Sequence, residues 1–445
     1  MAEQKERDMT SGVIWKELLY FFFPLLLSTL FQQLYNAVDA IIVGKFVGTE
    51  ALAAVGGSPA VIINLIVSIF VSLTTGSSVI IAQLYGAGHE KDLKKAVGTA
   101  MTFFILMGFV LIAVFEPFVY QALRLLGTPR DTVKDAADYL YIWYTSFPVL
   151  MLLNAEMGIL RAVGDSKTPL LFMVISCLAN IFLDLLFVIT FRMGVKGVAW
   201  ATVIAMFINM MLCTVKILRT KEAYKIRIKD LGTDIPMLKK MMEIGIPSAV
   251  SGSMYGISNA ILQASVNSLG TVNVASWALS GKIDGVYWAA SNAFGAAVTT
   301  FIGQNYGAKK TGRVKESVKV SLKLFIPLTM VLCIVIMLAA PLLLPIFSDD
   351  ISVQETTYRV LSYFVPFYLL WTFIEILEAV MRGCGEVKIP VIITAIGICV
   401  FRIVWVATVC RVHNSLLNVS LCYPLSWAVT DVAMLIYFLR WRKKL

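Results

Sequence analysis

Long apolar segments recur along this chain and constrain its fold more than any other feature. Each is about 20 residues or longer, the length at which an α-helix crosses the hydrocarbon core of a bilayer. The chain is 58% hydrophobic and only 15% charged, whereas soluble domains carry about 25% charged residues. The sequence therefore predicts an all-α integral membrane protein with twelve spans. These lie at residues 18–43, 57–82, 96–117, 137–160, 168–191, 197–218, 243–268, 276–302, 320–346, 357–380, 388–410 and 417–440.

Two phrases occur twice with the same spacing. QLYGA at 83–87 returns as QNYGA at 304–308, which defines a repeat step of 221 (306 − 85 = 221). RAVGDSKTP at 161–169 matches RGCGEVKIP at 382–390 with the same step. We interpret both loops as structural turns rather than substrate contacts. The step predicts two six-span lobes, residues 1–218 and 243–445, joined by a cytoplasmic linker at 219–242.

The Lys and Arg residues predict the orientation in the membrane. Roughly 26 of them fall in loops on the N-terminal side and 8 on the other side, a strong positive-inside bias. Both termini are therefore expected in the cytoplasm, in a multi-pass protein of the cell (cytoplasmic) membrane. Six spans return the chain to its starting side, so the lobes should be related by a pseudo-twofold axis along the membrane normal.

Several classes of function are disfavoured by the composition. The net charge of +10 does not indicate nucleic-acid binding, because Lys and Arg collect in alternate loops. Seven cysteines form no CxxC pair, and two histidines make a histidine metal site improbable. Without a Gly-x-Ser-x-Gly or Walker motif, an enzyme or an ATP-driven pump is disfavoured. We expect no cofactor beyond a driving ion, and a monomer in the lipid bilayer.

The clearest ionisable residue inside a span is Asp39, late in the first span. It shares a helix face with Tyr35 and Asn36, and with Gln32 one turn earlier. Charged groups inside a bilayer are costly, so they are functional candidates by default. The structural alternative is an Asp satisfied near the extracellular end. We favour a role in proton or cation coupling.

Span 5 places Asn180 and Asp184 one turn apart on one face. Their oxygens, with Thr202 of span 6 and Asn154 of span 4, form a donor set suited to Na⁺ or to a proton held between carboxylates. Asn and Thr in spans are also common as hydrogen-bonding links between helices, which is the alternative.

The repeat distinguishes these interpretations. With the step of 221, Asn180 and Asp184 correspond to Phe401 and Trp405 (180 + 221 = 401; 184 + 221 = 405). A requirement of the fold alone would be expected in both halves. The carboxylate cluster occurs in the first half only, which favours a coupling role specific to that lobe.

The second half carries its own charges. Glu375 and Glu378 lie one turn apart in span 10, where they could contact cationic compounds, form a second ion site or pair internally. Asp284 lies two residues after Lys282, so the two point to different faces and could pair with other helices. Such partners could be Arg402 and Asp431. The predicted substrate or second-site residues are Tyr35, Asn36, Met157, Glu375, Glu378 and Asp284.

Proline interrupts the first span of each half. Pro24 lies fifteen residues before Asp39, and Pro247 occupies the matching place in span 7. Proline removes a backbone donor and weakens a helix locally. Pro24 is either a hinge or a static kink.

The ordered motifs resemble the multidrug and toxic compound extrusion (MATE) family over essentially the whole chain. They include FPLLLSTLFQQLYNAVDAIIVGKFVGTEALAAVG, IAQLYGAG, LLGTPRDTVKDAADYLYIW, GILRAVGDSKTP and LANIFLDLLFV. The resemblance implies a twelve-helix exporter whose lobes form a V-shaped cavity, driven by Na⁺ or H⁺ entry. It also implies an N-lobe cation site at Asp39, Asn180, Asp184 and Thr202, and a span 1 that bends when the ion binds.

The hypothesis from sequence is thus a Na⁺- or H⁺-coupled antiporter that exports small organic, cationic compounds by alternating access. A lipid-linked oligosaccharide flippase of the same superfamily is the nearest alternative. Such proteins tend to have a cationic cavity, whereas the candidate groups here are largely acidic. A membrane-embedded enzyme is the more distant alternative.

Overall fold

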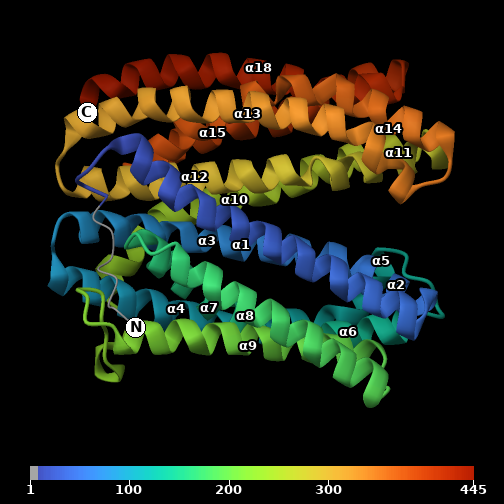
Figure 1. The fold of residues 1–445 in the computed structure, drawn as a ribbon, viewed down its shortest axis with the longest axis horizontal. Helices are drawn as coiled ribbons and strands as arrows, with labels where there is room; N and C mark the ends of the chain where they lie inside the picture. Colours follow the sequence, from blue (N-terminus) through green and yellow to red (C-terminus); the bar gives the residue numbers. More distant parts are fainter. Residues whose placement is uncertain (1–8) are drawn as a thin grey trace. The chain divides into compact units, whose positions relative to one another are not determined.

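The computed structural model describes residues 9–445, and this part of the chain is helical throughout, without a strand (Figure 1). Each of the twelve predicted spans falls on a helix or on consecutive helical segments. Within the described residues, nine helical segments are long and apolar enough to cross a membrane on their own. The other three predicted spans, 137–160, 243–268 and 276–302, are broken or rich in small polar residues. The predicted all-α membrane fold class is confirmed.

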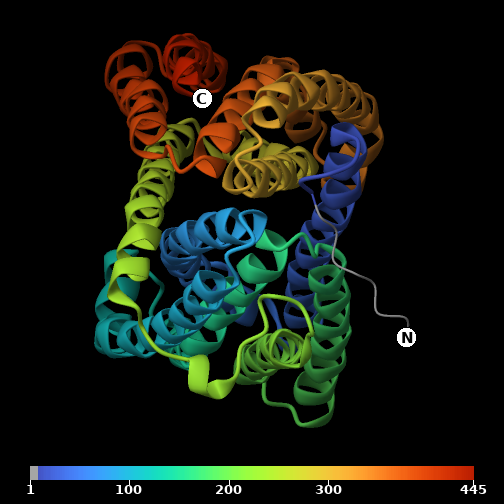
Figure 2. The same cartoon turned by 90° about the vertical axis from the view of Figure 1, so that its left-hand side faces the viewer.

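The chain divides into two compact units. Unit 1 contains residues 23–249, and unit 2 contains residues 9–22 and 250–445. Within each unit the long helices lie side by side with their axes roughly aligned (Figures 1 and 2). Their packed faces are apolar, and much of the apolar surface stays exposed, as expected of a protein whose solvent is lipid.

The helices that begin in the first half, in chain order, are α1 (Ile14–Ile42), α2 (Thr49–Gly56), α3 (Ser58–Gly86), α4 (Glu90–Phe115), α5 (Val119–Leu125), α6 (Val133–Tyr144), α7 (Phe147–Ala162), α8 (Lys167–Asp184) and α9 (Val195–Arg219). Short π or 3₁₀ turns lie between them at η1 (Val43–Val47), η2 (Glu116–Phe118), η3 (Leu185–Thr190) and η4 (Ile228–Asp230).

The helices of the second half are α10 (Ile235–Asn267), α11 (Thr271–Ile283), α12 (Gly285–Gly307), α13 (Thr311–Phe347), α14 (Ile351–Phe364), α15 (Tyr368–Gly383), α16 (Lys388–Thr394), α17 (Phe401–Trp405) and α18 (Leu416–Trp441). The short turns are η5 (Val365–Phe367), η6 (Ala395–Val400), η7 (Val406–Cys410) and η8 (Arg442–Lys444).

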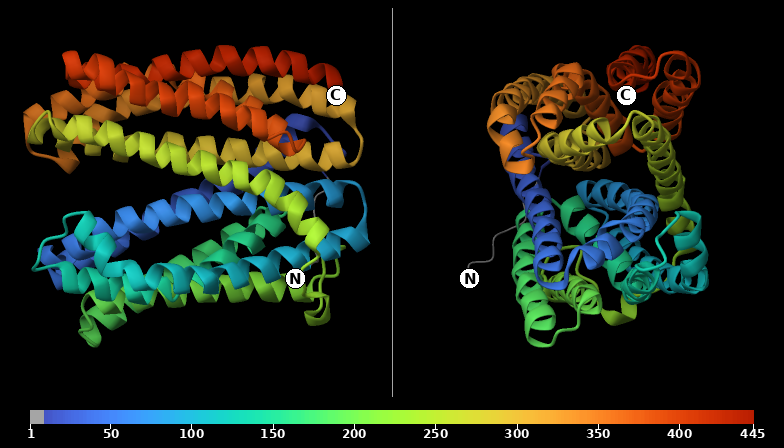
Figure 3. Two further views of the ribbon diagram at one scale, coloured as in Figure 1. Left: turned by 180° about the vertical axis from the view of Figure 1, so that it is seen from behind. Right: turned by 90° about the vertical axis from the view of Figure 1, so that its right-hand side faces the viewer.

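Two helices are divided between the units. α1 begins in unit 2 and enters unit 1 at residue 23, whereas α10 begins in unit 1 and enters unit 2 at residue 250. Both remain continuous helices, and Figure 3 shows α10 from behind as one long yellow-green coil. The units therefore differ from the predicted lobes 1–218 and 243–445 in these two helices. Residues 1–8 lie outside the described residues. They include Lys5 and Arg7, which were counted among the basic residues of the N-terminal side.

The segment before α1 is held on unit 2. Arg313 donates to the carbonyl oxygens of Ser11 at 2.6 Å and Gly12 at 2.8 Å. Lys310 donates to the carbonyl of Thr10 at 2.8 Å, and Asn305 donates to that of Met9 at 3.1 Å. The start of α1 is thereby fixed by backbone contacts within unit 2.

The segment before α10 is held on unit 1 in a corresponding way. The N–H groups of Gly232 and Asp234 donate to the hydroxyls of Thr102 at 3.0 Å and Thr99 at 3.1 Å. With the step of 221, residues 9–12 correspond to residues 230–233 (9 + 221 = 230). Each half thus anchors its first helix through the same short stretch of chain.

Glycine allows α10 to approach α3 closely. A Cβ on Gly76 would lie 2.0 Å from the carbonyl oxygen of Met241, and one on Gly245 would lie 2.5 Å from that of Leu73. Small residues at a helix crossing let backbones pack tightly in a membrane protein. This contact lies within unit 1, and it holds the first half of α10 there.

The repeated loops fold alike. After α3, the N–H groups of Ala87, Gly88 and His89 donate to the carbonyls of residues 83, 85 and 84. After α12, the N–H groups of residues 308, 309 and 310 make the same bonds to residues 304, 306 and 305. Gly88 and its counterpart Lys309 (88 + 221 = 309) have φ of 69° and 58°. The turn residue in the left-handed region is therefore Gly88 rather than Gly86 of the repeated phrase.

The second repeated loop also matches. Gly164 and Gly385, which are related by the same step (164 + 221 = 385), have φ of 91° and 87°. The π turn η3 after α8 starts at Leu185, and η7 starts at its counterpart Val406 (185 + 221 = 406). The step found in the sequence thus holds for backbone conformation as well as for residue identity.

Candidate functional site

The candidate site in unit 1 is centred on α8. Asn180 and Asp184 lie four residues apart on this helix, and both side chains are completely buried. Asp184 is the last α-helical residue, and the chain continues into the π turn η3. π turns are rare and occur frequently at functional sites, where they change the direction of side chains.

α1 brings the second carboxylate to this position. Asp39 and Asp184 lie close enough for their carboxyl groups to interact directly. A contact between two carboxyl groups is a hydrogen bond only if one of them carries a proton. Without a proton or a cation between them, the two charges repel each other at short range.

Two hydroxyl groups complete the surroundings of the pair. Tyr35, one turn before Asp39, lies within hydrogen-bond reach of Thr202 on α9. The hydroxyl of Thr202 donates a hydrogen bond to the carbonyl oxygen of Val198 at 3.0 Å. Thr202 can therefore only accept from Tyr35, which fixes the direction of that bond.

Tyr139 of α6 lies close to both carboxyl groups and is nearly buried. It was not among the predicted residues, although a signal was present in the sequence. Ala136, Leu140 and Trp143 recur at helical spacing, and all three are buried in the structure together with Tyr139. This periodicity separates Tyr139 from Tyr141, which is only half-buried.

Five buried polar atoms of this cluster have no hydrogen-bond partner among the described residues. They are Oδ1 of Asp39, both amide atoms of Asn180 and both carboxyl oxygens of Asp184. A buried polar atom without a partner costs about 1–3 kcal/mol. Such a group of atoms is consistent with a site that exchanges a bound ion, proton or water.

The donor set suits a small hard cation or a proton. Carboxylate, amide and hydroxyl oxygens are ligands for hard cations. Across the described residues, no group of three or more His, Cys, Asp or Glu side chains is placed to hold a metal. Two acidic groups with neutral oxygens therefore fit Na⁺ or H⁺ better than a transition metal.

The other residues predicted for this lobe have other partners or surroundings than the carboxylate pair. Asn154 donates its amide to the carbonyl of Leu150 on its own helix at 2.8 Å. Met157 is buried in the apolar core of unit 1, and Asn36 is exposed. The structure thus brings Asp39, Asn180, Asp184 and Thr202 together with Tyr35. It gives Asn154 a separate partner.

In unit 2, Glu375 and Glu378 make internal ion pairs. Nη2 of Arg382 lies 3.0 Å from Glu375, and Nη1 lies 3.9 Å from Glu378. Arg382 also donates Nε to Thr299 at 3.2 Å. The sequence left three alternatives for these glutamates: contact with cationic compounds, a second ion site or an internal ion pair. The contacts with Arg382 match the internal ion pair.

Asp284 lies between α11 and α12 and accepts two hydrogen bonds. Tyr368 donates its hydroxyl at 2.5 Å, and Trp288 donates its indole N–H at 3.2 Å. Arg402, one of the possible partners considered from the sequence, instead contacts neutral groups. The nearest partners of Asp284 are aromatic, and sequence spacing gives no sign of which aromatic residues converge.

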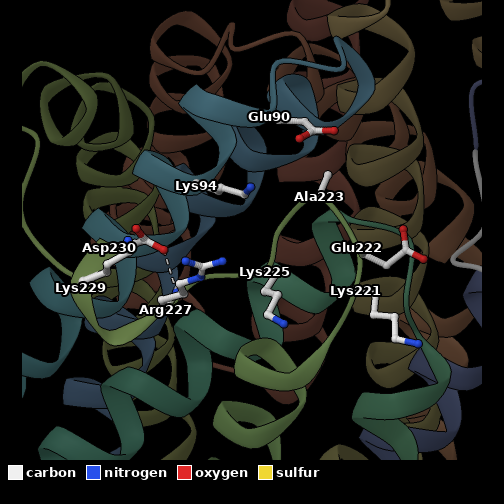
Figure 4. Close-up of a pocket in the computed structure, with 9 residues that line it drawn as sticks. All are labelled: Glu90, Lys94, Lys221, Glu222, Ala223, Lys225, Arg227, Lys229 and Asp230. Atoms are coloured by element: carbon white, nitrogen blue, oxygen red, sulfur yellow. Dashed lines mark hydrogen bonds between the residues drawn. The ribbon is translucent and has the colours of Figure 1, made fainter.

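A charged pocket lies outside the spans. It has a volume of about 360 Å³ and is formed by the start of α4 and the segment between α9 and α10 (Figure 4). The pocket is separate from the carboxylate pair, and the connecting segment supplies most of its lining. Its lining residues are Glu90, Lys94, Lys221, Glu222, Ala223, Lys225, Arg227, Lys229 and Asp230.

Comparison with known proteins agrees with this architecture. A family model described as MatE matches residues 24–186 and 247–408, two segments displaced by about one repeat (247 − 24 = 223). The chain is 30% identical over 444 residues to the "Probable multidrug resistance protein YoeA" of Bacillus subtilis (strain 168). That alignment covers 97% of this chain and 95% of the relative.

Two further similarities extend the comparison. The chain is 24% identical over 355 residues to the "FAD transporter" of Shewanella oneidensis, covering 78% of this chain and 77% of the relative. A solved structure described as an "Outward-facing conformation of a multidrug resistance MATE family transporter of the MOP superfamily" has a TM-score of 0.88 at 23% identity. It covers 100% of this chain and 98% of that chain. At 23% identity, the similarity to this solved structure shows the fold alone.

Proposed function

Because this chain belongs to the MatE family of membrane transporters and is not an enzyme, we propose that it is a cation-coupled antiporter for organic compounds. Entry of Na⁺ or H⁺ would drive the export of small amphipathic molecules, with organic cations as the class expected from the sequence. The name of the Bacillus relative supports drug export, and the name of the Shewanella relative shows that similar proteins are also described as carrying a dinucleotide.

The observation that carries the proposal is the Asp39–Asp184 pair with its buried, unpartnered oxygen atoms. A proton or Na⁺ would be held between the two carboxyl groups, with oxygens of Asn180 nearby. Tyr35 and Thr202 would fix α1 against α9 at the same level. Loss of the ion leaves two like charges at short range, which favours separation of α1 from α8.

Coupling to transport follows from the course of α1. This helix carries Asp39 in unit 1 and begins in unit 2, with Pro24 one residue after the change of unit. Occupation of the ion site would thereby change the conformation of a helix that both units share. The Na⁺- or H⁺-filled and empty states then differ in their preferred conformation, as ion-driven alternating access requires.

We also propose that the protein works as a monomer in the cytoplasmic membrane, with both termini inside. The bias of Lys and Arg to one side supports this orientation. The charged segment between α9 and α10 belongs to the proposed cytoplasmic side, consistent with its many basic residues.

The test is ethidium transport by purified protein in proteoliposomes, with a pH or Na⁺ gradient imposed separately. We expect Asp39→Asn and Asp184→Asn each to lower gradient-driven transport by about tenfold or more, because each removes one of the two charges that bind the ion. A matched control is Asp138→Asn, since Asp138 has its own partner, Lys196, at 3.0 Å. Wild-type rates in both site variants would overturn the assignment.

A further inference from the structure

We propose that unit 2 contains an anion-binding site centred on Arg402, which takes the phosphate or carboxylate group of a flat aromatic compound. This inference rests on the proposed transport function and adds a substrate class to it. It comes from a single unusual feature, a buried guanidinium inside a span that has only neutral partners.

Arg402 lies in α17, in the middle of the eleventh predicted span, and its side chain is 3% exposed. Nε donates to the hydroxyl of Ser426 at 3.2 Å, and Nη1 donates to Oδ1 of Asn259 at 3.4 Å. The guanidinium carbon lies 3.9 Å from the centre of the Tyr423 ring. These contacts fix the orientation of the guanidinium without neutralising its charge.

None of the described carboxylates of unit 2 pairs with Arg402, and the buried Asp431 of α18 has an unpartnered Oδ1. Glu375 and Glu378 pair with Arg382, and Asp284 accepts from Tyr368 and Trp288. Among the described residues, no carboxylate forms an ion pair with Arg402, and its Nη2 has no hydrogen-bond acceptor. An unpaired charge in a membrane span is expensive and marks a functional position. A free Nη2 on an oriented guanidinium suits a phosphate or carboxylate oxygen.

The backbone around Arg402 is irregular. π turns flank α17 on both sides, at η6 and η7. Gly397 in η6 packs against Thr430 of α18, where an added Cβ would lie 2.3 Å from the hydroxyl. The turn η7 has a counterpart after α8, but Arg402 itself corresponds to Ile181 (402 − 221 = 181). The arginine is therefore specific to the second half, as the carboxylate pair is specific to the first.

Aromatic rings surround this position. Tyr423, which stacks under Arg402, lies 5.8 Å from Trp427 between ring centres, and Trp427 lies 6.2 Å from Trp371. The indole N–H of Trp427 is fully buried and has no acceptor among the described residues. The Tyr423–Trp427 pair is edge-to-face and the Trp427–Trp371 pair is tilted. Two unpaired donors within this aromatic cluster fit a ligand that combines an aromatic plane with acceptor oxygens.

Polar residues lead outward from this position within unit 2. Asn259, the acceptor for Arg402, is exposed on α10, and Tyr255 one turn earlier is half-buried. An exposed amide in the middle of a span is consistent with a hydrated surface rather than a lipid-facing one. The residue that accepts from the guanidinium is thus itself exposed on α10.

The experiment compares flavin mononucleotide with riboflavin, which share one ring system and differ by a single phosphate. Binding to purified protein in detergent is followed by flavin fluorescence anisotropy. Wild-type protein is expected to bind flavin mononucleotide about tenfold more tightly than riboflavin, because only the former reaches Arg402. Arg402→Gln should abolish this preference and leave riboflavin binding within about twofold, and Arg402→Lys should retain part of it.

Arg411→Gln is the matched control, since Arg411 is exposed at the end of the same span. Equal affinity of wild-type protein for the two flavins would overturn the proposal, whether or not the variants fold. An unchanged preference in Arg402→Gln would also overturn it. Phosphatidylglycerol that displaces flavin mononucleotide at equal concentration would identify a lipid headgroup site instead and contradict an aromatic ligand.

The test of the anion site can be separated from the test of ion-coupled transport. Asp39→Asn should lose ion-driven ethidium transport while keeping the preference for flavin mononucleotide. Arg402→Gln should lose the preference, and the control Arg411→Gln should keep both the preference and ion-driven ethidium transport. Failure of the ethidium assay alone would reject the antiport mechanism, and failure of the flavin comparison alone would reject the anion site.

Discussion

Individual side chains of unit 1 define the chemistry of the candidate ion site more narrowly than their sequence positions do. Asp39 and Asp184 lie in the first and fifth predicted spans, far apart in the chain, and interact directly in the structure. Their identity could be predicted, because ionisable residues inside spans are rare and costly. Which hydroxyl groups face them could not, since that depends on how α1, α6 and α9 are rotated against one another.

Tyr139 provides a test at this scale. Tyr139→Phe removes a hydroxyl close to both carboxyl groups and keeps the ring in the core. We expect the ion concentration for half-maximal transport to rise by about fivefold with little change in the maximal rate, because one polar neighbour of the ion is lost. Transport in proteoliposomes at graded Na⁺ or pH measures both quantities.

Tyr141→Phe is the control for this substitution. It lies two residues away on a different face of α6, beside the ring of Tyr120 at 6.2 Å. If both variants changed the ion dependence equally, Tyr139 would have no particular role at the ion site.

At the scale of elements, a proline lies close to the residue at which each of α1 and α10 passes from one unit to the other. Pro24 lies one residue after residue 23, where α1 enters unit 1, and Pro247 lies three residues before residue 250, where α10 enters unit 2. The sequence predicted a weak point in each helix. It could not predict that these points coincide with unit boundaries, because those depend on contacts distant in the chain.

Pro24→Ala tests whether α1 bends in the transport cycle. The substitution restores a backbone N–H and stiffens the helix, so we expect the folded protein to keep its thermal stability and to transport ethidium about tenfold more slowly. Pro327→Ala in α13 is the control, because that helix lies entirely in unit 2. Equal rates for wild type and Pro24→Ala would indicate a static kink.

Gly76→Ala tests the packing of α10 on unit 1. A methyl group there would lie 2.0 Å from the carbonyl of Met241, so one helix must shift. We expect a loss of about 1–3 kcal/mol in the free energy of unfolding, seen as a lower thermal midpoint in detergent. Gly281→Ala in α11, with no atom within 4 Å of the added methyl, should be neutral or slightly stabilising. A Gly76→Ala protein as stable as Gly281→Ala would contradict the close contact.

At the scale of the whole molecule, the repeat shows how much the sequence could predict. The step between the two copies predicted turns that recur in hydrogen bonding, in φ and in a π turn. Such local structure follows from short motifs. The exchange of α1 and α10 between units could not be predicted, since the anchors at residues 9–12 and 230–234 have little sequence in common. The different ionisable residues of the halves remain the strongest indication that the two units have different roles.

In the proposed antiport, ion and substrate move in opposite directions through one protein, and a reversed transport experiment measures this exchange. An ethidium gradient alone is imposed across proteoliposomes, and proton or sodium movement is recorded with a pH-sensitive dye or with radioactive sodium. Because coupling between two ligands is reciprocal, we expect uphill ion movement opposite to ethidium, absent in Asp39→Asn and Asp184→Asn. Ethidium equilibration without any ion movement in the wild-type protein would contradict it.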